Sequence, residues 1–515
     1  MLEFQKYIKN PDIKLKDIQL EACDRMYNTD SILLAFSCGL GKTLVVLSTC
    51  EAIRESEPDA KFIVIIPKSA RSVFIKEFET KISAPFAIIG TDVNKKYAYT
   101  DQPYILIEQP QLEKTERKEK QFFYADFITA LRQETDNINL VIDEAHTVMT
   151  SPKTLRYRTI YECKEVYRRK YLLTASPLLN SIDSLFFVYN FINNEKPFDD
   201  WFRFQYHYCV LEEKEITVMK RSKYPNKPPF KVQRKITQCV GYKNLDELRE
   251  PIMKNTILGS IVYDLTYDYI KFNLDSELHD EYIVATKGLK EGFEHFKESE
   301  VKDEDKVQHS ARLVKLQNIV DGLTTDPFSY TCNKEKELMK LLKTITCKDE
   351  GAIIYADYKE TVKRISELME LYKDELNINN IYVISGEIKV PERIKIEKAL
   401  TRRDVCIITR AGCVSINLQA VNHIILYNVP FSQADAEQSI GRICRCNSTY
   451  DKKYVHILEC DGTIDTYKRI LFQQLSKLVN QIFDNQHPTL PTDLIREDNR
   501  LRRQLKWSFL WKPKI

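Results

Sequence analysis

The sequence has no long hydrophobic run, and this absence excludes one class of protein. Of its 515 residues 43% are hydrophobic, yet no stretch of about 18 or more uncharged apolar residues occurs. A membrane-spanning helix is therefore not expected. The first residues, Met1 to Lys6, include acidic and polar side chains and precede no apolar run, so they do not resemble a secretory signal.

Closely paired cysteines are also scarce. The 13 cysteines are scattered singly, with no CxxC pair, and only Cys444 and Cys446 lie close together. A zinc site or a disulfide framework is therefore not expected, and a reducing intracellular compartment is favoured. The nucleus or cytoplasm of a host and a bacterial cytoplasm remain open alternatives.

Net charge is nearly absent, at +3, but the basic residues are unevenly placed. Residues 216–235 contain seven Lys or Arg and no acid, and residues 500–515 contain six and no acid. Such runs are most often solvated faces or loose tails. A nucleic-acid contact is the other interpretation, because a binder of this size needs a local basic patch rather than a high overall charge.

Short apolar runs form two groups along the chain. The first group lies at 32–36, 62–66, 104–107, 140–142 and 171–173, and the second at 352–355, 381–384, 405–408, 423–426 and 454–458. Polar residues and a helix-like stretch follow each run. This alternation predicts an α/β fold with two parallel-sheet domains in tandem, each with helices on both faces.

The region between the two groups has a different character. It is rich in charge and in helical stretches such as Lys287–Val301 and His309–Val320, and it carries the basic, Pro-containing segment. We expect a first domain at 1–195, a mostly helical insertion at 196–345, a second domain at 346–480 and a basic tail at 481–515. No internal repeat is visible.

The first candidate site follows the apolar run that ends at Phe36. It reads Ser37-Cys38-Gly39-Leu40-Gly41-Lys42-Thr43 and precedes a predicted helix. Glycines let backbone N–H groups close around phosphates, Lys42 can reach the β- and γ-phosphates, and the Thr43 hydroxyl can bind Mg²⁺. The strict pattern has Gly where this chain has Phe36. A glycine-rich turn with a chance lysine is the alternative.

The second candidate site is Asp143-Glu144-Ala145-His146, directly after the run 140–142. Asp143, at the end of a strand, suits a magnesium ion held through water. Glu144 suits the base that orients and deprotonates an attacking water. An Asp-Glu pair alone is usually a charged turn, but here it follows the phosphate loop by about 100 residues, which leaves room for two or three strand–helix units.

The third candidate site lies in the second group of runs and reads Gln438-Ser439-Ile440-Gly441-Arg442-Ile443-Cys444-Arg445. At helical spacing Gln438, Arg442 and Arg445 share one face. Two converging arginines are typical of an arginine finger, which stabilises charge on a transferred phosphoryl group. An exposed amphipathic helix is the alternative. A finger in the second domain would have to act across a cleft.

These three segments, in this order, resemble the superfamily 2 helicases, and the residues between them resemble the Snf2-like branch, which carries a DEAH sequence. Further matching segments are Ile66-Pro67-Lys68-Ser69, Leu173 to Asn180, Asn417-Leu418 and Gly462 to Asp465. The resemblance covers about 15–195 and 310–475. The chain departs from the family pattern at Ser415, where Gly is usual, at Ile107-Glu108-Gln109, and at Lys254-Asn255-Thr256, where a double arginine belongs.

The resemblance implies RecA-like domains, ATP and Mg²⁺ as cofactors, and several further contacts. Gln19 would bond to the adenine edge, and Gly412 would contribute to the nucleotide site. Lys68, Ser69, Thr409 and Arg410 follow predicted strands, at the edge where open α/β sheets bind ligands, and could hold nucleic-acid phosphates.

The resemblance also implies a function, an ATP-dependent motor that translocates on double-stranded DNA and remodels or displaces what is bound there. A strand-separating DNA or RNA helicase is the alternative, and a non-hydrolysing transcription or assembly factor is a third interpretation. Transcription or replication machinery are candidate partners, and no oligomer is implied. The compact length resembles viral, phage or plasmid-borne members.

Overall fold

We analysed a computed structural model of the chain. It describes residues 3–82, 84–90, 101–113, 122–176, 178, 182–193, 198, 200–220, 230–260, 264–293, 313–325, 330–410, 412, 416–430, 433–444, 448 and 450–483. No helix among these residues is long and apolar enough to cross a membrane.

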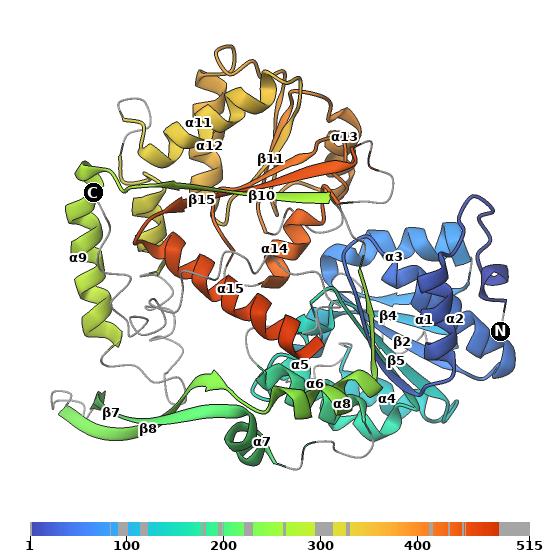
Figure 1. Ribbon diagram of the computed structural model, residues 1–515. Coiled ribbons are helices and arrows are strands. Elements are labelled where there is room, and N and C mark those ends of the chain that lie inside the picture. Colours follow the sequence, from blue (N-terminus) through green and yellow to red (C-terminus); the bar gives the residue numbers. More distant parts are fainter. Residues whose placement is uncertain are drawn as a thin grey trace.

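The first sheet has seven parallel strands in the order β3-β4-β2-β5-β6-β1-β9. Its strands β2, β4 and β5 are labelled in Figure 1, beside α1 and α2. Their bounds are β1 Ser31–Phe36, β2 Lys61–Ile66, β3 Phe86–Ile89, β4 Tyr104–Glu108, β5 Ile138–Ile142, β6 Arg169–Thr174 and β9 Thr256–Gly259. The helices are α1 Asp17–Tyr27, α2 Lys42–Ser56, α3 Arg71–Glu77, α4 Tyr124–Leu131, α5 Leu155–Glu162 and α6 Asp183–Ile192.

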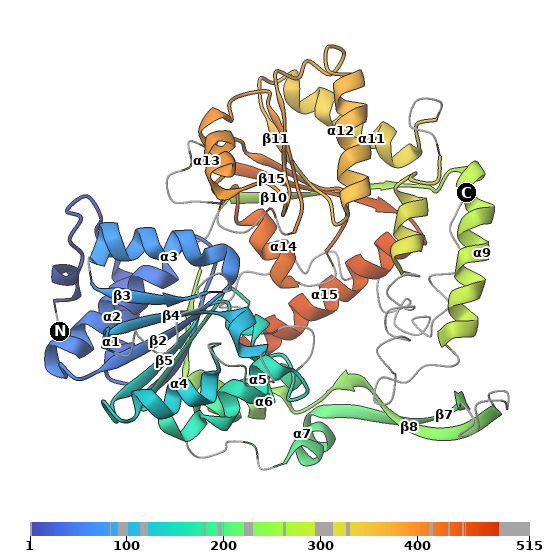
Figure 2. The same ribbon diagram turned by 180° about the vertical axis from the view of Figure 1, so that it is seen from behind.

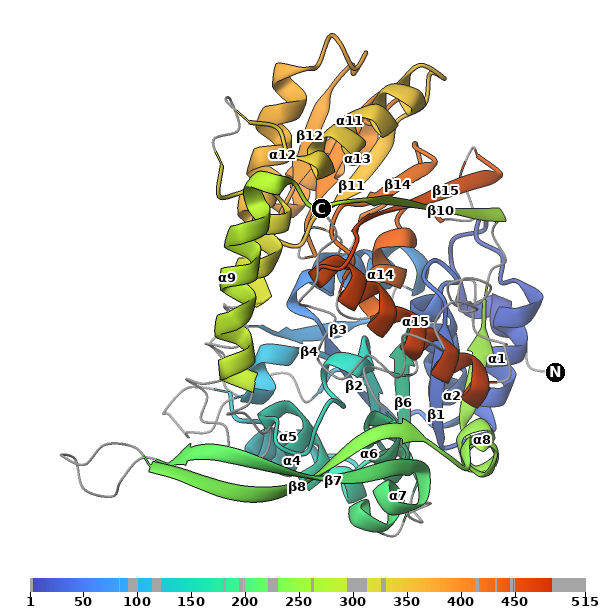
Figure 3. The same cartoon turned by 60° about the vertical axis from the view of Figure 1, so that its left-hand side comes forward.

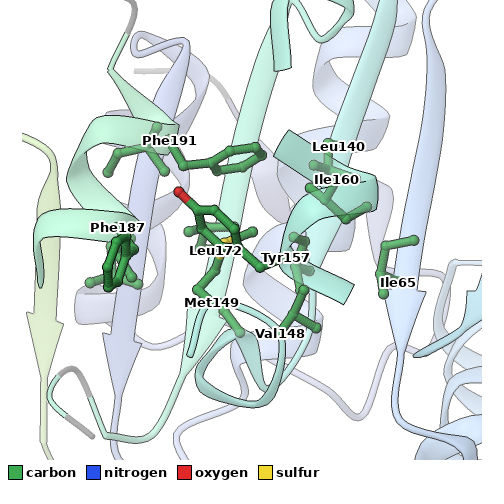
Figure 4. Close-up of a cluster of buried hydrophobic side chains, with 14 of the residues drawn as sticks. Ile65, Leu140, Val148, Met149, Tyr157, Ile160, Leu172, Phe187 and Phe191 are labelled. Atoms are coloured by element: carbon green, nitrogen blue, oxygen red, sulfur yellow. The ribbon is translucent and has the colours of Figure 1, made fainter. Parts of the chain in front are cut away.

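Successive residues of each buried strand supply two separate cores, because side chains alternate between the faces of a sheet. On β2, Val64 packs with α1 and α2, whereas Ile63 and Ile65 pack with α4, α5 and α6. Figure 4 shows the second core, in which Tyr157 of α5 and Phe187 of α6 cover Leu172 of β6. Burial on both faces is the reason these strands are continuously apolar.

The second sheet has six parallel strands in the order β10-β15-β14-β11-β13-β12. Their bounds are β10 Asp264–Phe272, β11 Ala352–Tyr355, β12 Ile381–Ile384, β13 Val405–Ile408, β14 His423–Leu426 and β15 Lys452–Cys460. The helices are α11 Asn333–Thr346, α12 Lys359–Leu371, α13 Val390–Ala399, α14 Gln433–Ile440 and α15 Ile464–Phe483. The predicted α/β class with two parallel sheets in tandem is confirmed.

Of the helical stretches expected in the middle region, residues 287–293 and 313–320 are helical and residues 294–312 lie outside the described residues. The region also contains four strands that the sequence interpretation did not separate. Its elements outside the two parallel sheets are α7 Trp201–Tyr208, β7 Cys209–Lys220, β8 Phe230–Tyr242, α8 Leu245–Lys254 and α9 Ser276–Phe293. β7 and β8 form an antiparallel hairpin that projects from the body of the molecule (Figure 3). β9 joins the first sheet and β10 the second, so the described chain passes from one sheet to the other between Gly259 and Asp264.

α15 connects the two halves physically. It begins after β15 of the second sheet, and its last residues, among them Leu478 and Ile482, belong to the core of the first half. Arg249 of α8 donates to the backbone oxygens of Gln481, at 2.9 Å, and Ile482, at 3.4 Å. Figure 2 shows α14 and α15 between the two sheets. A movement of one half relative to the other must therefore involve α15.

Candidate nucleotide site

The phosphate loop lies between β1, which ends at Phe36, and α2, which begins at Lys42. Gly39 and Gly41 have φ angles of 87° and 77°, in the left-handed region that favours glycine. A Cβ on Gly41 would lie 2.6 Å from Gln19 Nε2, so a side chain there would both strain the backbone and displace the Gln19 amide. The loop thus brings its backbone to the N-terminus of α2, where free N–H groups and the helix dipole favour an anion.

Lys42 and Gln19 both bond to the backbone of this loop. Lys42 Nζ donates to Phe36 O at 3.0 Å. Gln19 Nε2 donates to Leu40 O at 2.8 Å, and Gln19 Oε1 accepts from Lys16 N at 2.8 Å. Gln19 therefore lies at the loop, as a nucleotide contact must, but its amide supports the loop in this structure. Its contact with adenine remains a prediction.

Asp143 follows β5 directly and is 8% exposed. Its N–H donates to Ile65 O at 2.9 Å, and its carbonyl accepts from Gln109 Nε2 at 3.2 Å, so its backbone is fixed. Burial, and then the charge of Glu144, raise the pKa of the Asp143 carboxyl to about 7, and the nearby positive charge of Lys42 opposes this rise. The two sequence-predicted segments therefore lie close enough for their charges to interact.

Glu144 has a left-handed backbone, with φ 48°, a conformation that costs a non-glycine residue free energy. Its Oε2 lies 3.3 Å from His146 Nδ1, which is also 3.2 Å from Thr174 Oγ1 at the end of β6. Burial lowers the pKa of His146, so the imidazole is neutral at pH 7. The strained turn presents the two carboxylates side by side beyond the sheet, and His146 links them to β6.

The chemistry of these groups fits a magnesium nucleotide. The helix N-terminus and Lys42 suit phosphate oxygens, and the Thr43 hydroxyl and the buried Asp143 carboxylate are oxygen ligands of the kind Mg²⁺ prefers. In the described part of the chain no three His, Cys, Asp or Glu side chains gather as a metal site. Mg²⁺ would therefore depend on these two side chains together with phosphate and water oxygens.

The second half of the molecule reaches this site through α14. Ser176, just after β6, donates from Oγ to Glu437 Oε2 at 2.5 Å. A Cβ on Gly441 would lie 2.6 Å from Cys38 Cβ, so the chain after α14 packs directly against the phosphate loop. Ser176 and Gly441 lie in segments that the sequence analysis quotes, but no role was predicted for either, and Glu437 was not named. Gly441 carried a signal, since a glycine inside a helix-like pattern often marks a close approach.

Arg442 is placed differently from the helical face that the sequence predicts. α14 ends at Ile440, and Arg442 lies in the turn that follows. Arg442 is 7% exposed, and its guanidinium donates to Ile416 O at 3.0 Å and Gln438 O at 3.1 Å. Arg442 therefore stabilises the turn in which it lies. Gln438 is half-buried on α14, and Arg445 lies outside the described residues.

The residues predicted to contact nucleic-acid phosphates are of two kinds. Lys68 and Ser69 form an exposed 3₁₀ turn after β2. Thr409 is buried, and its Oγ1 accepts from Gly412 N at 3.2 Å, whereas the exposed Arg410 pairs with Asp435 at 2.8 Å. A Cβ on Gly412 would lie 1.9 Å from Ile384 O, so Gly412 is required by the packing of its loop.

Family models match both halves of the chain. Residues 12–178 match the res subunit of type III restriction enzymes, and residues 333–447 match the helicase conserved C-terminal domain. Both matched ranges contain candidate site residues, Lys42 and Asp143 in the first and Gln438 in the second.

Curated relatives align over most of the chain. The nuclear protein STH1/NPS1 of Saccharomyces cerevisiae is 23% identical over 92% of this chain and 35% of its own length. The ATP-dependent DNA helicase DDM1 of Arabidopsis thaliana is 23% identical over 87% of this chain and 58% of its own. An uncharacterized ATP-dependent helicase of Bacillus subtilis, YqhH, is 20% identical over 90% and 80%. The chain therefore spans about a third of the yeast relative's length.

Solved structures also resemble the chain. The SWI2/SNF2 ATPase core of Sulfolobus solfataricus in complex with double-stranded DNA is 19% identical, with a TM-score of 0.38 over 99% of this chain and 98% of that one.

Proposed function

Because this chain belongs to the Snf2-like branch of the superfamily 2 helicases, a group of ATP-hydrolysing enzymes, we propose that it is a DNA-dependent ATPase that translocates on double-stranded DNA. In this proposal the motor remodels or displaces proteins or strands bound to its track. The observation that carries it is the assembly of one site from both halves. The phosphate loop and Asp143 lie together on the first half, and the chain after α14 packs on that loop at Cys38.

We assign the roles at the site from the chemistry of its side chains. Lys42 and the N–H groups of Gly39 to Thr43 bind the β- and γ-phosphates of ATP, and Thr43 and Asp143 hold Mg²⁺, which supplies positive charge to the phosphates when bound. Glu144 orients the attacking water and takes its proton. Its backbone turn and His146 hold the carboxylate in place.

The second half completes the site only when the two halves are close. Arg445 is proposed as the finger that stabilises charge on the transferred phosphoryl group, and Gln438 as a neighbour of the γ-phosphate. Arg442, which binds backbone oxygens, is proposed to hold the turn that carries Arg445. A duplex lying across Lys68 and Ser69 on one half and Arg410 on the other would favour the closed arrangement, and so stimulate hydrolysis by a shift in population.

The test of this function measures ATP turnover with and without duplex DNA, beside displacement of a triplex-forming strand. Hydrolysis stimulated by duplex, with displacement of the third strand and no separation of the duplex, supports translocation. Separation of the duplex would establish the alternative, a strand-separating helicase for DNA or RNA. No ATP turnover under any condition would leave only the third interpretation, a non-hydrolysing transcription or assembly factor.

The basic segments are proposed as an additional contact with the track. Residues 216–220 and 230–235 belong to the hairpin strands β7 and β8. Residues 221–229 between them, and the tail after Phe483, lie outside the described residues. Replacing Lys220, Arg221, Lys223 and Lys227 by neutral residues should weaken DNA binding. It should also reduce the salt dependence of binding by about one slope unit for each phosphate that the variant no longer neutralises. An unchanged slope would identify these residues as solvated surface.

The domain bounds, the location and the partners are also proposals. Because β9 belongs to the first sheet and β10 to the second, we propose that the first domain extends to about Gly259 and that the second begins near Asp264. An intracellular location and partners in transcription or replication follow from the proposed track. The relatives named above are cellular proteins, so a viral or plasmid origin stays a prediction.

A further inference from the structure

Two cysteines far apart in the sequence meet at the root of the hairpin. Cys209 begins β7, and Cys239 lies on β8, opposite Leu211. Cys209 and Leu211 are two residues apart on one strand and so share a face, which is also the face of Cys239. The pairing shifts between Val210 and Leu211. At this irregularity Cys239 Sγ donates to Gly241 O at 3.2 Å, and Cys209 is near enough for a hydrogen bond to shift the pKa of Cys239.

The two thiols have different surroundings. Cys209 is 1% exposed and belongs to the core of the first half, whereas Cys239 is exposed. The hydrogen bond from Cys209 lowers the pKa of Cys239 to about 7, against the effect of partial burial. The same hydrogen bond and burial raise the pKa of Cys209. Near neutral pH the pair is therefore an exposed thiolate beside a protected thiol.

An exposed thiolate beside a second thiol reacts readily with oxidants, and its oxidation can be reversed. A thiolate that solvent can reach attacks oxidants, and a second thiol in contact with it resolves the product before further oxidation. The other exposed cysteine among the described residues, Cys347, follows α11 in the second half, far from the hairpin. It offers an internal comparison for any measurement on Cys239.

We propose that Cys209 and Cys239 are a modification site at which a peroxide oxidises the pair to a disulfide across the hairpin root. The Cys239 thiolate attacks one oxygen of the peroxide, the O–O bond breaks, and Cys239 becomes a sulfenic acid. For hydrogen peroxide the leaving hydroxide takes up a proton as water. The sulfur of Cys209 then attacks the sulfenic sulfur, the S–O bond breaks and a second water leaves with the thiol proton. In sum two thiols and one peroxide give one disulfide and two waters.

The disulfide ties β7 to β8 where the hairpin leaves the first half. Cellular thiols reverse it by exchange, so it is compatible with a reducing compartment and forms when peroxide rises. The proposal does not depend on the motor function, because it rests on the hairpin alone. A failure of ATP hydrolysis in the tests above would leave it intact.

The first test maps the bond directly. The reduced full chain is treated with equimolar hydrogen peroxide, its free thiols are alkylated, and its peptides are analysed by mass spectrometry without reduction. We expect the peptides of Cys209 and Cys239 to be joined, to separate after dithiothreitol, and not to join in Cys239→Ser, while Cys347 stays alkylated. Sulfenic or higher oxidation of Cys239 without the link, or a link only between other cysteines, would overturn the proposal.

The second test measures reactivity without an oxidant and does not need the link to form. At pH 7 Cys239 should react with iodoacetamide about 5- to 15-fold faster than Cys347, because a thiol with a pKa near 7 holds far more thiolate than an ordinary cysteine. In Cys209→Ala the hydrogen bond is removed, and this advantage should fall to about twofold or less. Equal rates for Cys239 and Cys347 in the unmodified chain would contradict the proposed thiolate.

Discussion

Each half of the molecule buries aspartates, but their surroundings differ between the two halves. In the second half, Asp321 is surrounded by donors, with Lys334 Nζ at 2.9 Å, Thr361 Oγ1 at 2.9 Å and Asn428 Nδ2 at 3.0 Å. Lys334 also binds Asp465 of α15 at 2.8 Å. In the first half, burial raises the pKa of Asp143 to about 7 in spite of Lys42 nearby.

The difference separates structural from chemical use of the same residue type. Asp321 and Asp465 with Lys334 join α11, α12, the end of β14 and α15, so both carboxylates are hydrogen-bonded within the fold and share the charge of Lys334. Asp143 is buried without full compensation, which destabilises the protein but leaves a carboxylate ready for a cation. Strongly perturbed carboxyls in such positions are frequent at functional sites.

The largest effect is expected from removing Lys42. In Lys42→Ala the ATP turnover should fall by roughly two or more orders of magnitude, because the phosphates lose their positively charged ligand. The fold and DNA binding should be retained, since Lys42 is half-buried at the start of α2 and outside both cores. Steady-state ATPase assays and circular dichroism check both points. Turnover equal to that of the unmodified chain would refute the phosphate-loop assignment.

Breaking the compensated cluster should affect stability instead. Asp321→Ala leaves Lys334 paired with Asp465 but removes the acceptor of Thr361 and Asn428, and each buried donor left without a partner costs about 1–3 kcal/mol. We therefore expect a clear loss in the free energy of unfolding, measured by urea denaturation. A variant as stable as the unmodified protein would show that the cluster does not hold the second half together.

Asp143→Asn should instead raise the free energy of unfolding. A carboxyl whose pKa rises from 3.8 to about 7 on folding destabilises the native state as pH increases through that interval. Without nucleotide the variant should be more stable than the parent by roughly 2–4 kcal/mol at pH 8, and by less at pH 5. It should also lose ATP hydrolysis.

A matched control for this variant is Asp404→Asn in the second half. The Asp404 carboxylate is buried and accepts from Thr401 N at 2.6 Å and Thr401 Oγ1 at 2.9 Å. An amide there loses part of this bonding, so the control should lose stability where Asp143→Asn gains it. Destabilisation by both changes would erase the proposed contrast between the halves.

The smallest effect is expected at the contact between the halves. Ser176→Ala removes the hydrogen bond to Glu437, which helps to hold α14 against the first half. ATP turnover at saturating duplex should fall by a few fold, since a single hydrogen bond contributes about 0.5–1.5 kcal/mol. Ser56→Ala is the control, because the Ser56 hydroxyl donates to the backbone oxygens of Ala52 and Ile53 and accepts from the Tyr27 hydroxyl, all within the first half. Equal losses in both variants would assign the effect to general stability.

Much of this architecture could be predicted because its signals are local. The buried strands β1, β2, β5 and β6 are continuous apolar runs, and the loop before Lys42 and the pair Asp143-Glu144 follow two of them directly. Because the strands are parallel, residues that directly follow them lie at the same edge of the sheet, and this could be predicted from the direction of the chain alone. The order of the segments then indicated two domains.

The features that escaped prediction depend on distant partners. β9 is four residues long, and it is a strand because it pairs with β1, more than 200 residues earlier in the chain. The hydrogen bond from Ser176 to Glu437 likewise joins residues that the sequence separates widely. The helical face proposed for Gln438, Arg442 and Arg445 does not continue as predicted, because α14 ends at Ile440 and Gly441 packs on Cys38.

The central claim is that the strained turn after β5 holds the catalytic base of an ATP site, and Glu144→Gln tests it most directly. The amide keeps the shape of the side chain but cannot take a proton from water. ATP bound at equilibrium and the rate of a single turnover should be measured on the same preparation. The account predicts ATP affinity within about threefold of the parent and a rate lower by roughly two or more orders of magnitude. A rate equal to that of the parent would contradict the assignment of the base.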